Sequence, residues 1–207
     1  GGPPEGLDRF AAEGGVGTAR HLRLGGDEFW IVDTAGAVHG GVREAGARLV
    51  VHGSPFGAWT ALRAALASNI PTWLALTVDD EDGTRLRSGE SLHALAPLLE
   101  RLRPAALLLN CSRPEAIAAG LPLLAQFGLP YGAYANGFTH ISENFLKDAP
   151  TVKELTHRHD LTPEKYAEFA MLWVGMGATI VGGCCEVGPA HIAHLASKLK
   201  AMGHELV

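Results

Sequence analysis

Residues 178–185 have the sequence Ala-Thr-Ile-Val-Gly-Gly-Cys-Cys, a short apolar run that ends in two glycines and two adjacent cysteines. An apolar run without polar alternation is typical of a parallel strand that is buried on both faces. Adjacent side chains in a regular strand point to opposite faces, but a glycine-rich strand end can turn so that the thiols of Cys184 and Cys185 reach one ion. The stretch therefore predicts a buried strand with chemistry at its carboxyl end.

Short apolar runs recur upstream, and each precedes a polar or glycine-rich turn and then a segment with helical spacing. These runs occupy residues 48–51, 72–78, 105–110 and 130–134. Alternation of strands and helices is typical of an α/β protein with a parallel sheet. We predict five such units over residues 46–207. Residues 1–45 fit the pattern poorly and should supply at most two strands, of which residues 29–32 are the clearest.

Two helix starts can be placed from capping residues. Thr162 followed by Pro163 predicts a helix that runs to about Met176, where Gly177 ends it. Ser112 is likewise expected to cap a helix over the residues that follow it.

Composition excludes several classes of protein. Of 207 residues, 47% are hydrophobic and 19% are charged, which fits one globular domain over residues 1–207 and argues against disorder. The net charge is −5 and the basic residues are scattered, so no nucleic-acid partner is expected. No apolar run approaches the roughly 20 residues needed to cross a bilayer, and no signal peptide is recognisable. We therefore expect no membrane partner and a cytoplasmic location.

Three cysteines are an odd number, which argues against a disulfide framework. Cys111 ends one apolar run, and Cys184 and Cys185 end another, so all three are expected at the carboxyl ends of parallel strands. Three soft sulfur ligands suit zinc, and an open fourth position is typical of a catalytic site. Two alternatives stay open at this point: three buried free cysteines, and, more rarely, a disulfide between Cys184 and Cys185.

Three motifs resemble those of the homocysteine S-methyltransferases. Residues 182–185 with Gly-Pro-Ala-His-Ile at 188–192 resemble the C-terminal signature of that family. Asn-Cys-Ser at 110–112, with Pro-Glu at 114–115, resembles its other cysteine motif, and Tyr-Ala-Asn-Gly at 134–137 resembles a conserved turn after the next strand. Their order and approximate spacing agree from about residue 46 to the C-terminus.

The resemblance implies a (β/α)8 TIM barrel in which Cys111, Cys184 and Cys185 hold Zn²⁺ and the sulfur of homocysteine takes the open position. The thiolate would then accept a methyl group from a small donor, giving methionine. The sequence does not identify that donor: betaine, S-methylmethionine, S-adenosylmethionine and a methyl-corrinoid all fit. Two residues are candidates for substrate binding. Asn136 follows its strand, although Asn-Gly is also a common turn pair. Glu13 opens Glu-Gly-Gly-Val-Gly-Thr, which resembles the family's Asp-Gly-Gly-x-Gly-Thr.

The N-terminal half departs from the family pattern. Glu13 replaces the usual Asp, and residues 52–55 are His-Gly-Ser-Pro where the family places a Glu that contacts the substrate amine. An eight-stranded barrel needs about 200 to 250 residues with its helices. Five units occupy residues 46–207, and residues 1–45 are too few for the other three strands and their helices, so we expect an incomplete barrel that lacks N-terminal strands. A natural short paralogue and a fragment of a longer protein both fit this shortening.

Two functions follow from these observations. The first is an enzyme, a homocysteine S-methyltransferase. The alternative is a non-catalytic zinc-binding or assembly module that kept the metal site and lost the amino-acid pocket. If these residues are the whole polypeptide, open strand edges should drive pairing with another copy, and methyl transfer should be weak.

Overall fold

The computed structural model divides into two compact units. One unit comprises Gly1–Leu76 and His93–Leu107, and the other comprises Thr77–Leu92 and Leu108–Val207. The expectation of a single domain stays a prediction. The residues that the structure describes are 17–24, 27–34, 38–41, 48–52, 62, 66, 71–139 and 155–206.

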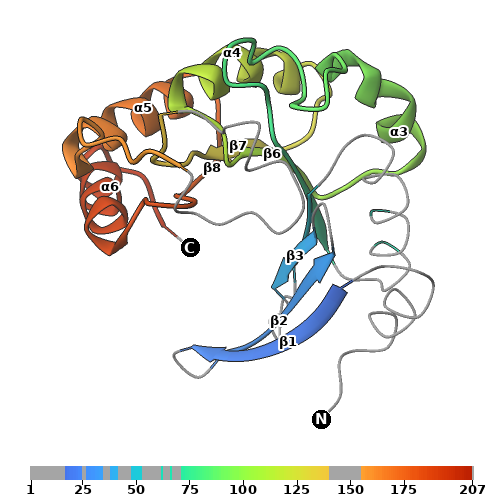
Figure 1. Cartoon of the computed structure of the whole chain (residues 1–207), viewed down its shortest axis with the longest axis horizontal. Coiled ribbons are helices and arrows are strands. Elements are labelled where there is room, and N and C mark those ends of the chain that lie inside the picture. Colours follow the sequence, from blue (N-terminus) through green and yellow to red (C-terminus); the bar gives the residue numbers. More distant parts are fainter. Residues whose placement is uncertain are drawn as a thin grey trace. The chain divides into compact units, whose positions relative to one another are not determined.

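Five strands of the first unit lie wholly within its described residues. They are β1 (Gly17–Leu24), β2 (Asp27–Thr34), β3 (Val38–Gly41), β4 (Arg48–His52) and β5 (Thr72–Leu76). Strands β1 and β2 form an antiparallel pair, β3 is antiparallel to β4, and β4 is parallel to β5 (Figure 1). The 3-10 helix η1 (Leu92–Leu95) belongs to this unit from His93 onward, and helix α3 (Ala96–Arg101) follows it.

The expectation of at most two strands in residues 1–45 is wrong, because β1, β2 and β3 all lie there. The first two strands mix polar and apolar residues, so no continuous apolar run marks them in the sequence. Gly25 and Gly26 separate these two strands, and a glycine pair between two such segments is a hairpin signal that the search for apolar runs passed over.

The second unit carries the strand ends that bear the cysteines. Its strands are β6 (Ala106–Asn110), whose last three residues belong to this unit, β7 (Tyr131–Tyr134) and β8 (Ile180–Val181). They are neighbours in that order, and β7 is parallel to β8 with Gly132 opposite Ile180. All five residues of β6 are buried, as expected of a strand covered on both faces. The three strands lie within the predicted apolar runs, which confirms this part of the strand prediction.

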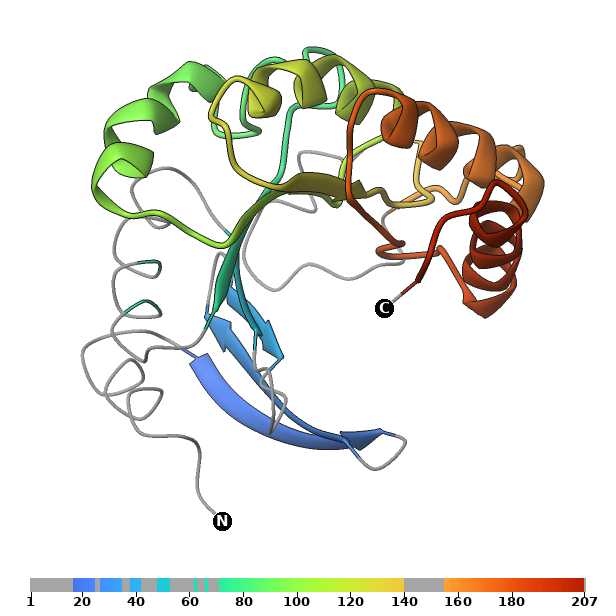
Figure 2. The same cartoon turned by 180° about the vertical axis from the view of Figure 1, so that it is seen from behind.

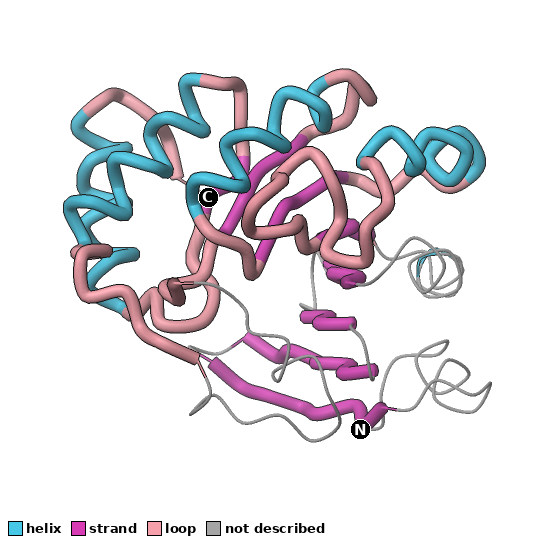
Figure 3. Tube along the Cα trace, turned by 45° about the horizontal axis from the view of Figure 1, so that its top comes forward, coloured by secondary structure: helices cyan, strands magenta, loops and turns pink. Residues whose placement is uncertain are grey.

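Helices cover these strands from outside (Figures 2 and 3). Helix α4 (Pro114–Ala125) packs on β7, α5 (Pro163–Gly175) packs on α4, β7 and β8, and α6 (Pro189–Ala201) packs on α5. The core between helices and strands is apolar; its large buried side chains are Leu107, Leu108, Leu109, Leu121, Leu124, Tyr166 and Trp173. Among the described helices, none is both long enough and apolar enough to span a membrane.

Helix α5 begins and ends as predicted. The Thr162 side chain accepts a hydrogen bond from the Lys165 backbone N–H at 3.3 Å, and Pro163 is the first helical residue. The helix ends at Gly175, and Gly177 adopts a φ of 97°, a left-handed conformation that glycine accepts without steric cost.

The prediction that Ser112 caps helix α4 is wrong. Arg113 occupies the cap position and makes no side-chain cap bond. Ser112 is fully buried, and its hydroxyl donates to the Val78 carbonyl and accepts from the Val78 backbone N–H, both at 3.0 Å. The turn after β6 therefore directs this hydroxyl toward residues 77–92 instead of toward the helix end.

Strands β7 and β8 approach closely because Gly132 has no side chain. A β-carbon at Gly132 would overlap the carbonyl oxygen of Ile180. Gly175, at the end of α5, has no atom within 4 Å of such a position.

We therefore expect Gly132→Ala to destabilise the chain by about 3 kcal/mol or more, because backbone would have to move. Gly175→Ala is the control, and it should change stability by less than about 1 kcal/mol, in the stabilising direction. Urea unfolding followed by circular dichroism measures both. Equal midpoints for the two variants would contradict the close approach of β7 and β8.

Candidate metal centre

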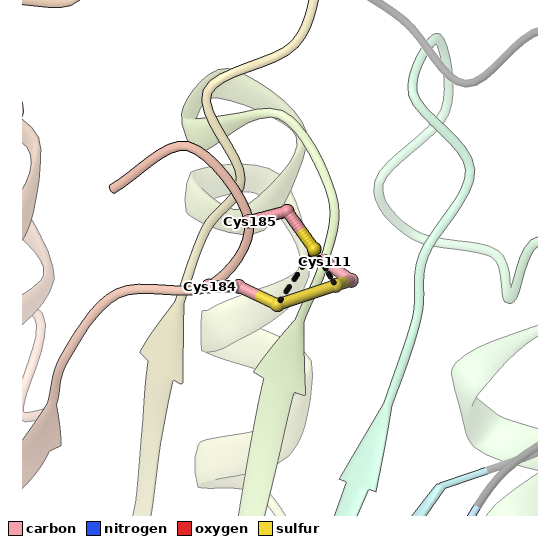
Figure 4. A group of neighbouring side chains, drawn as sticks. All are labelled: Cys111, Cys184 and Cys185. Carbon is pink, nitrogen blue, oxygen red and sulfur yellow. Dashed lines mark hydrogen bonds between the residues drawn. A yellow bond between two sulfur atoms is a disulfide. The ribbon is translucent and has the colours of Figure 1, made fainter. Parts of the chain in front are cut away.

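The three cysteines converge at the carboxyl ends of β6 and β8 (Figure 4). Cys111 follows β6, and Cys184 and Cys185 follow β8 after two glycines. The Cys185 sulfur lies 4.0 Å from the Cys111 sulfur and 3.9 Å from the Cys184 sulfur. Cys111 and Cys184 form a disulfide in this structure, with Cα atoms 5.8 Å apart, and Cys185 is free.

This geometry bears out the expected positions of the cysteines. The strands that end at Asn110 and near Gly183 are separated by one strand, β7, and the three sulfurs lie within 4.8 Å of one another. The alternative of three buried cysteines does not hold, since Cys185 is exposed and the other two are half-buried. The disulfide joins Cys111 to Cys184, so the structure does not contain the adjacent Cys184–Cys185 disulfide.

One backbone segment binds both cysteine turns, which are the turn after β6 that contains Cys111 and the turn after β8 that contains Cys184 and Cys185. Residues 134–137, which comprise the last residue of β7 and the three that follow, lie between the turn after β6 and the turn after β8. The segment makes two hydrogen bonds to each turn. The donors and acceptors are Cys111 N to Tyr134 O (3.2 Å), Asn136 N to Ser112 O (3.2 Å), Cys184 N to Ala135 O (2.9 Å) and Gly137 N to Cys185 O (2.8 Å).

The cysteine turns also contain unusual backbone conformations. Cys111 has a φ of 47° and Glu186, next to Cys185, has a φ of 63°. They are the only residues other than glycine with positive φ in the part of the chain that the structure describes. Such a conformation costs about 1–3 kcal/mol and persists where surrounding contacts enforce it, often at functional sites.

Charge near Cys185 does not favour a free thiolate. Burial raises the pKa of the Cys185 thiol, a backbone hydrogen bond lowers it, and the nearby Glu186 carboxylate raises it further. A cation at the cluster would reverse this balance, because a coordinating thiol is deprotonated.

Two of the three sulfur separations match a tetrahedral metal-thiolate site, and the third pair is joined as a disulfide. Tetrahedral Zn–S bonds of about 2.3 Å place neighbouring sulfurs about 3.8 Å apart, close to the 3.9 and 4.0 Å that separate Cys185 from the other two. The Cys111–Cys184 disulfide is the oxidised alternative to this state, since only a reduced thiolate binds metal. Three thiolates would leave the fourth tetrahedral position free, and Cys185 is exposed.

The predicted substrate residues are only partly described. The Asn136 side-chain oxygen accepts a hydrogen bond from the Phe138 backbone N–H at 3.1 Å, which is the turn role that the Asn-Gly pair also predicted. Its contact with substrate stays a prediction. Glu13 lies outside the described residues.

Tyr166 supports the site from helix α5 and was not identified from the sequence. Its hydroxyl accepts from the Ala135 backbone N–H at 3.0 Å and donates to the Gly182 carbonyl at 2.5 Å, so it joins the end of β7 to the glycines before Cys184. Burial raises the pKa of Tyr166 well above its usual value, which keeps the hydroxyl protonated as a donor. Helical spacing places Tyr166 on the same face as Trp173, which predicts burial but not its polar partners.

Residues 53–199 match the homocysteine S-methyltransferase family. Since this match covers more than half of the chain, the chain belongs to that family. The homocysteine S-methyltransferase of Escherichia coli (strain K12) is 30% identical over 131 residues, which are 61% of this chain and 38% of that protein. The selenocysteine methyltransferase of Astragalus bisulcatus is 30% identical over 121 residues, or 58% of this chain and 33% of that protein. The chain thus spans well under half the length of these relatives.

Solved structures agree on the fold. The apo form of the homocysteine methyltransferase MmuM from Escherichia coli superposes with a TM-score of 0.51 at 24% identity, over 70% of this chain and 46% of that one. Its metallated form gives a TM-score of 0.51 at 23% identity, over 69% and 41%. An oxidised form of the same protein has also been solved. These likenesses confirm the α/β fold of the TIM-barrel family, of which this chain covers a part.

Removal of the Tyr166 hydroxyl tests its support of the cysteine turn. Tyr166→Phe leaves the Ala135 N–H and the Gly182 carbonyl without this partner in a buried place, so we expect a loss of about 1–3 kcal/mol of stability. The matched control is Tyr131→Phe, whose exposed hydroxyl donates to the Met176 carbonyl and whose loss should cost less than about 0.5 kcal/mol. Thermal unfolding of the reduced, metal-free chain compares the two. A smaller loss of stability for Tyr166→Phe than for Tyr131→Phe would contradict the role of the Tyr166 hydroxyl in supporting the cysteine turn.

Proposed function

We propose that the chain transfers a methyl group from a small donor to the sulfur of homocysteine, giving methionine, with Cys111, Cys184 and Cys185 as the ligands of a zinc ion. The observation that carries this proposal is the convergence of three sulfurs from two strand ends, with the Cys185 sulfur at the spacing of a zinc-thiolate site from the other two. Family membership supports it independently.

Zinc, when bound, would keep a substrate thiol deprotonated near neutral pH. The residues of this chain supply the rest of the arrangement. The three thiolates leave one position for the substrate sulfur, and the segment 134–137 fixes the distance between the two cysteine turns. In the transfer, the homocysteine sulfur forms a bond to the methyl carbon, while the bond from that carbon to the donor breaks and its electron pair leaves with the donor. No general base on the protein is required.

Two arguments support homocysteine as the acceptor of the methyl group: the names of the relatives and the chemistry of the metal site. One relative is named for homocysteine and another for selenocysteine, and both substrates present a soft chalcogen atom. A soft acceptor suits a borderline-soft metal with thiolate ligands. Recognition of the amino-acid part rests on Asn136 and Glu13, and the choice of donor stays open among the four small methyl donors named above.

A second candidate is a non-catalytic zinc-binding or assembly module. It is favoured by residues 52–55, which are His-Gly-Ser-Pro and lack the Glu that the family uses for the substrate amine. Homocysteine binding separates the two candidates, because only the first requires an open position that accepts a thiol.

The first test concerns metal content. We expect the reduced chain to bind one zinc ion, and we expect Cys111→Ser, Cys184→Ser and Cys185→Ser each to lower zinc affinity more than about 100-fold, because water or a hydroxyl replaces a thiolate poorly. His204→Ala, which removes an exposed imidazole near the C-terminus, is the control and should bind zinc as the unchanged chain does. Competition with a chromogenic chelator measures affinity. Full zinc affinity in all three cysteine variants would refute the metal centre.

The second test concerns the substrate. Titration of homocysteine into the zinc-loaded chain should release about one proton per site, because the thiol binds as a thiolate. Homoserine, which carries a hydroxyl in place of the thiol, should bind much more weakly and release none. Calorimetry in two buffers of different ionisation enthalpy counts the protons. Equal binding of both compounds would favour the non-catalytic candidate.

A further inference from the structure

A partly buried arginine contacts the backbone of the first cysteine. The Arg87 guanidinium donates from both Nη1 and Nη2 to the carbonyl oxygen of Cys111, each at 3.3 Å. The side chain of Arg87 is only 17% exposed. This residue lies in the loop after β5, within residues 77–92, and is distant from Cys111 in the sequence. None of the sequence motifs includes it.

Asp80 fixes the position of this arginine. Its carboxylate oxygen Oδ1 accepts from Arg87 Nη2 at 3.1 Å and from the Arg113 backbone N–H at 3.0 Å. The Asp80 side chain is 9% exposed, so the pair is largely shielded from water and less screened than a surface ion pair. The Asp80 carboxylate thus binds both Arg87 and the backbone of Arg113.

The loop that contains Asp80 and Arg87 binds the turn after β6 at three successive residues, 111–113. Arg87 binds the carbonyl of Cys111, Val78 exchanges two hydrogen bonds with the Ser112 hydroxyl, and Asp80 binds the backbone of Arg113. These contacts oppose the cost of the left-handed conformation at Cys111, whose φ is 47°. The direction of the Cys111 side chain follows from that backbone conformation.

We propose that Arg87, oriented by Asp80, is a positioning residue for the metal centre that holds the Cys111 sulfur toward Cys184 and Cys185. The proposal rests on the metal centre described under the proposed function. Partners that orient metal ligands from outside the coordination shell typically contribute 10- to 100-fold in metal affinity. Arg87 would act through its contact with the Cys111 carbonyl, not as a ligand of the metal.

The nature of the contact decides which substitution is informative. Arg87→Lys keeps a positive charge beside Asp80 but replaces the planar fork, which gives two N–H groups to one carbonyl, by a single ammonium. Arg87→Met removes the charge and leaves Asp80 without this partner, which also risks the stability of the fold. Arg85, two residues earlier, is the matched control, because its side chain is 57% exposed, pairs with Asp82 and donates to the Gly89 carbonyl.

Cobalt(II) is the probe, because its thiolate charge-transfer absorption reports sulfur ligands directly. In the reduced chain we expect Arg87→Lys to lower cobalt affinity about 10-fold and Arg87→Met up to about 100-fold. If the Cys111 sulfur no longer reaches the ion, the absorption per bound cobalt should fall by about one third, as one of three thiolates is lost. Arg85→Lys should leave affinity and absorption unchanged. The unfolding midpoint of metal-free Arg87→Lys should stay close to that of the unchanged chain.

Two results would overturn the proposal in distinguishable ways. Cobalt affinity and absorption in Arg87→Lys equal to those of the unchanged chain would show that Arg87 has no positioning role, while the metal centre itself would stand. Absence of thiolate-to-cobalt absorption in the unchanged chain would overturn the metal centre and the role of Arg87 with it.

Discussion

The register of three neighbouring strand ends is the constraint on which the candidate site depends. Segment 134–137 continues the path of β7 and bonds through its backbone to the turn after β6 on one side and to the turn after β8 on the other. Parallel strands bring their carboxyl ends to the same edge of a sheet, so cysteines far apart in the sequence meet there. Gly132 permits the close approach of β7 and β8, and Tyr166 holds the end of β7 to Gly182 from the helical layer.

The same positions serve two chemical states of the cysteines. In the oxidised state Cys111 and Cys184 are covalently joined and Cys185 remains a thiol. Reduction would free all three sulfurs for one ion, and they already lie within 4.8 Å of one another. The disulfide and the three-thiolate metal site therefore exclude each other, because a disulfide sulfur is not a thiolate ligand.

The sequence predicts this site well where chemistry and periodicity coincide. The apolar runs before Cys111 and Cys184 locate the strands, and the rarity of cysteine makes the cluster recognisable. The sequence does not predict which hydrogen-bond partners a polar side chain has when several are possible. Ser112 has the sequence context of a helix cap, yet the buried turn offers it the backbone of Val78 instead. The sequence likewise does not predict the contact of Arg87 with Cys111, because this contact depends on the conformation of the loop after β5.

We propose that the three cysteines form a metal site with one open position for a thiol. X-ray absorption at the zinc edge on the reduced, zinc-loaded chain tests it most directly, because it counts the sulfur neighbours of the ion. We expect three sulfurs at about 2.3 Å before homocysteine is added and four after it. Two or fewer sulfurs in the zinc-loaded chain, or a count that homocysteine leaves unchanged, would contradict it.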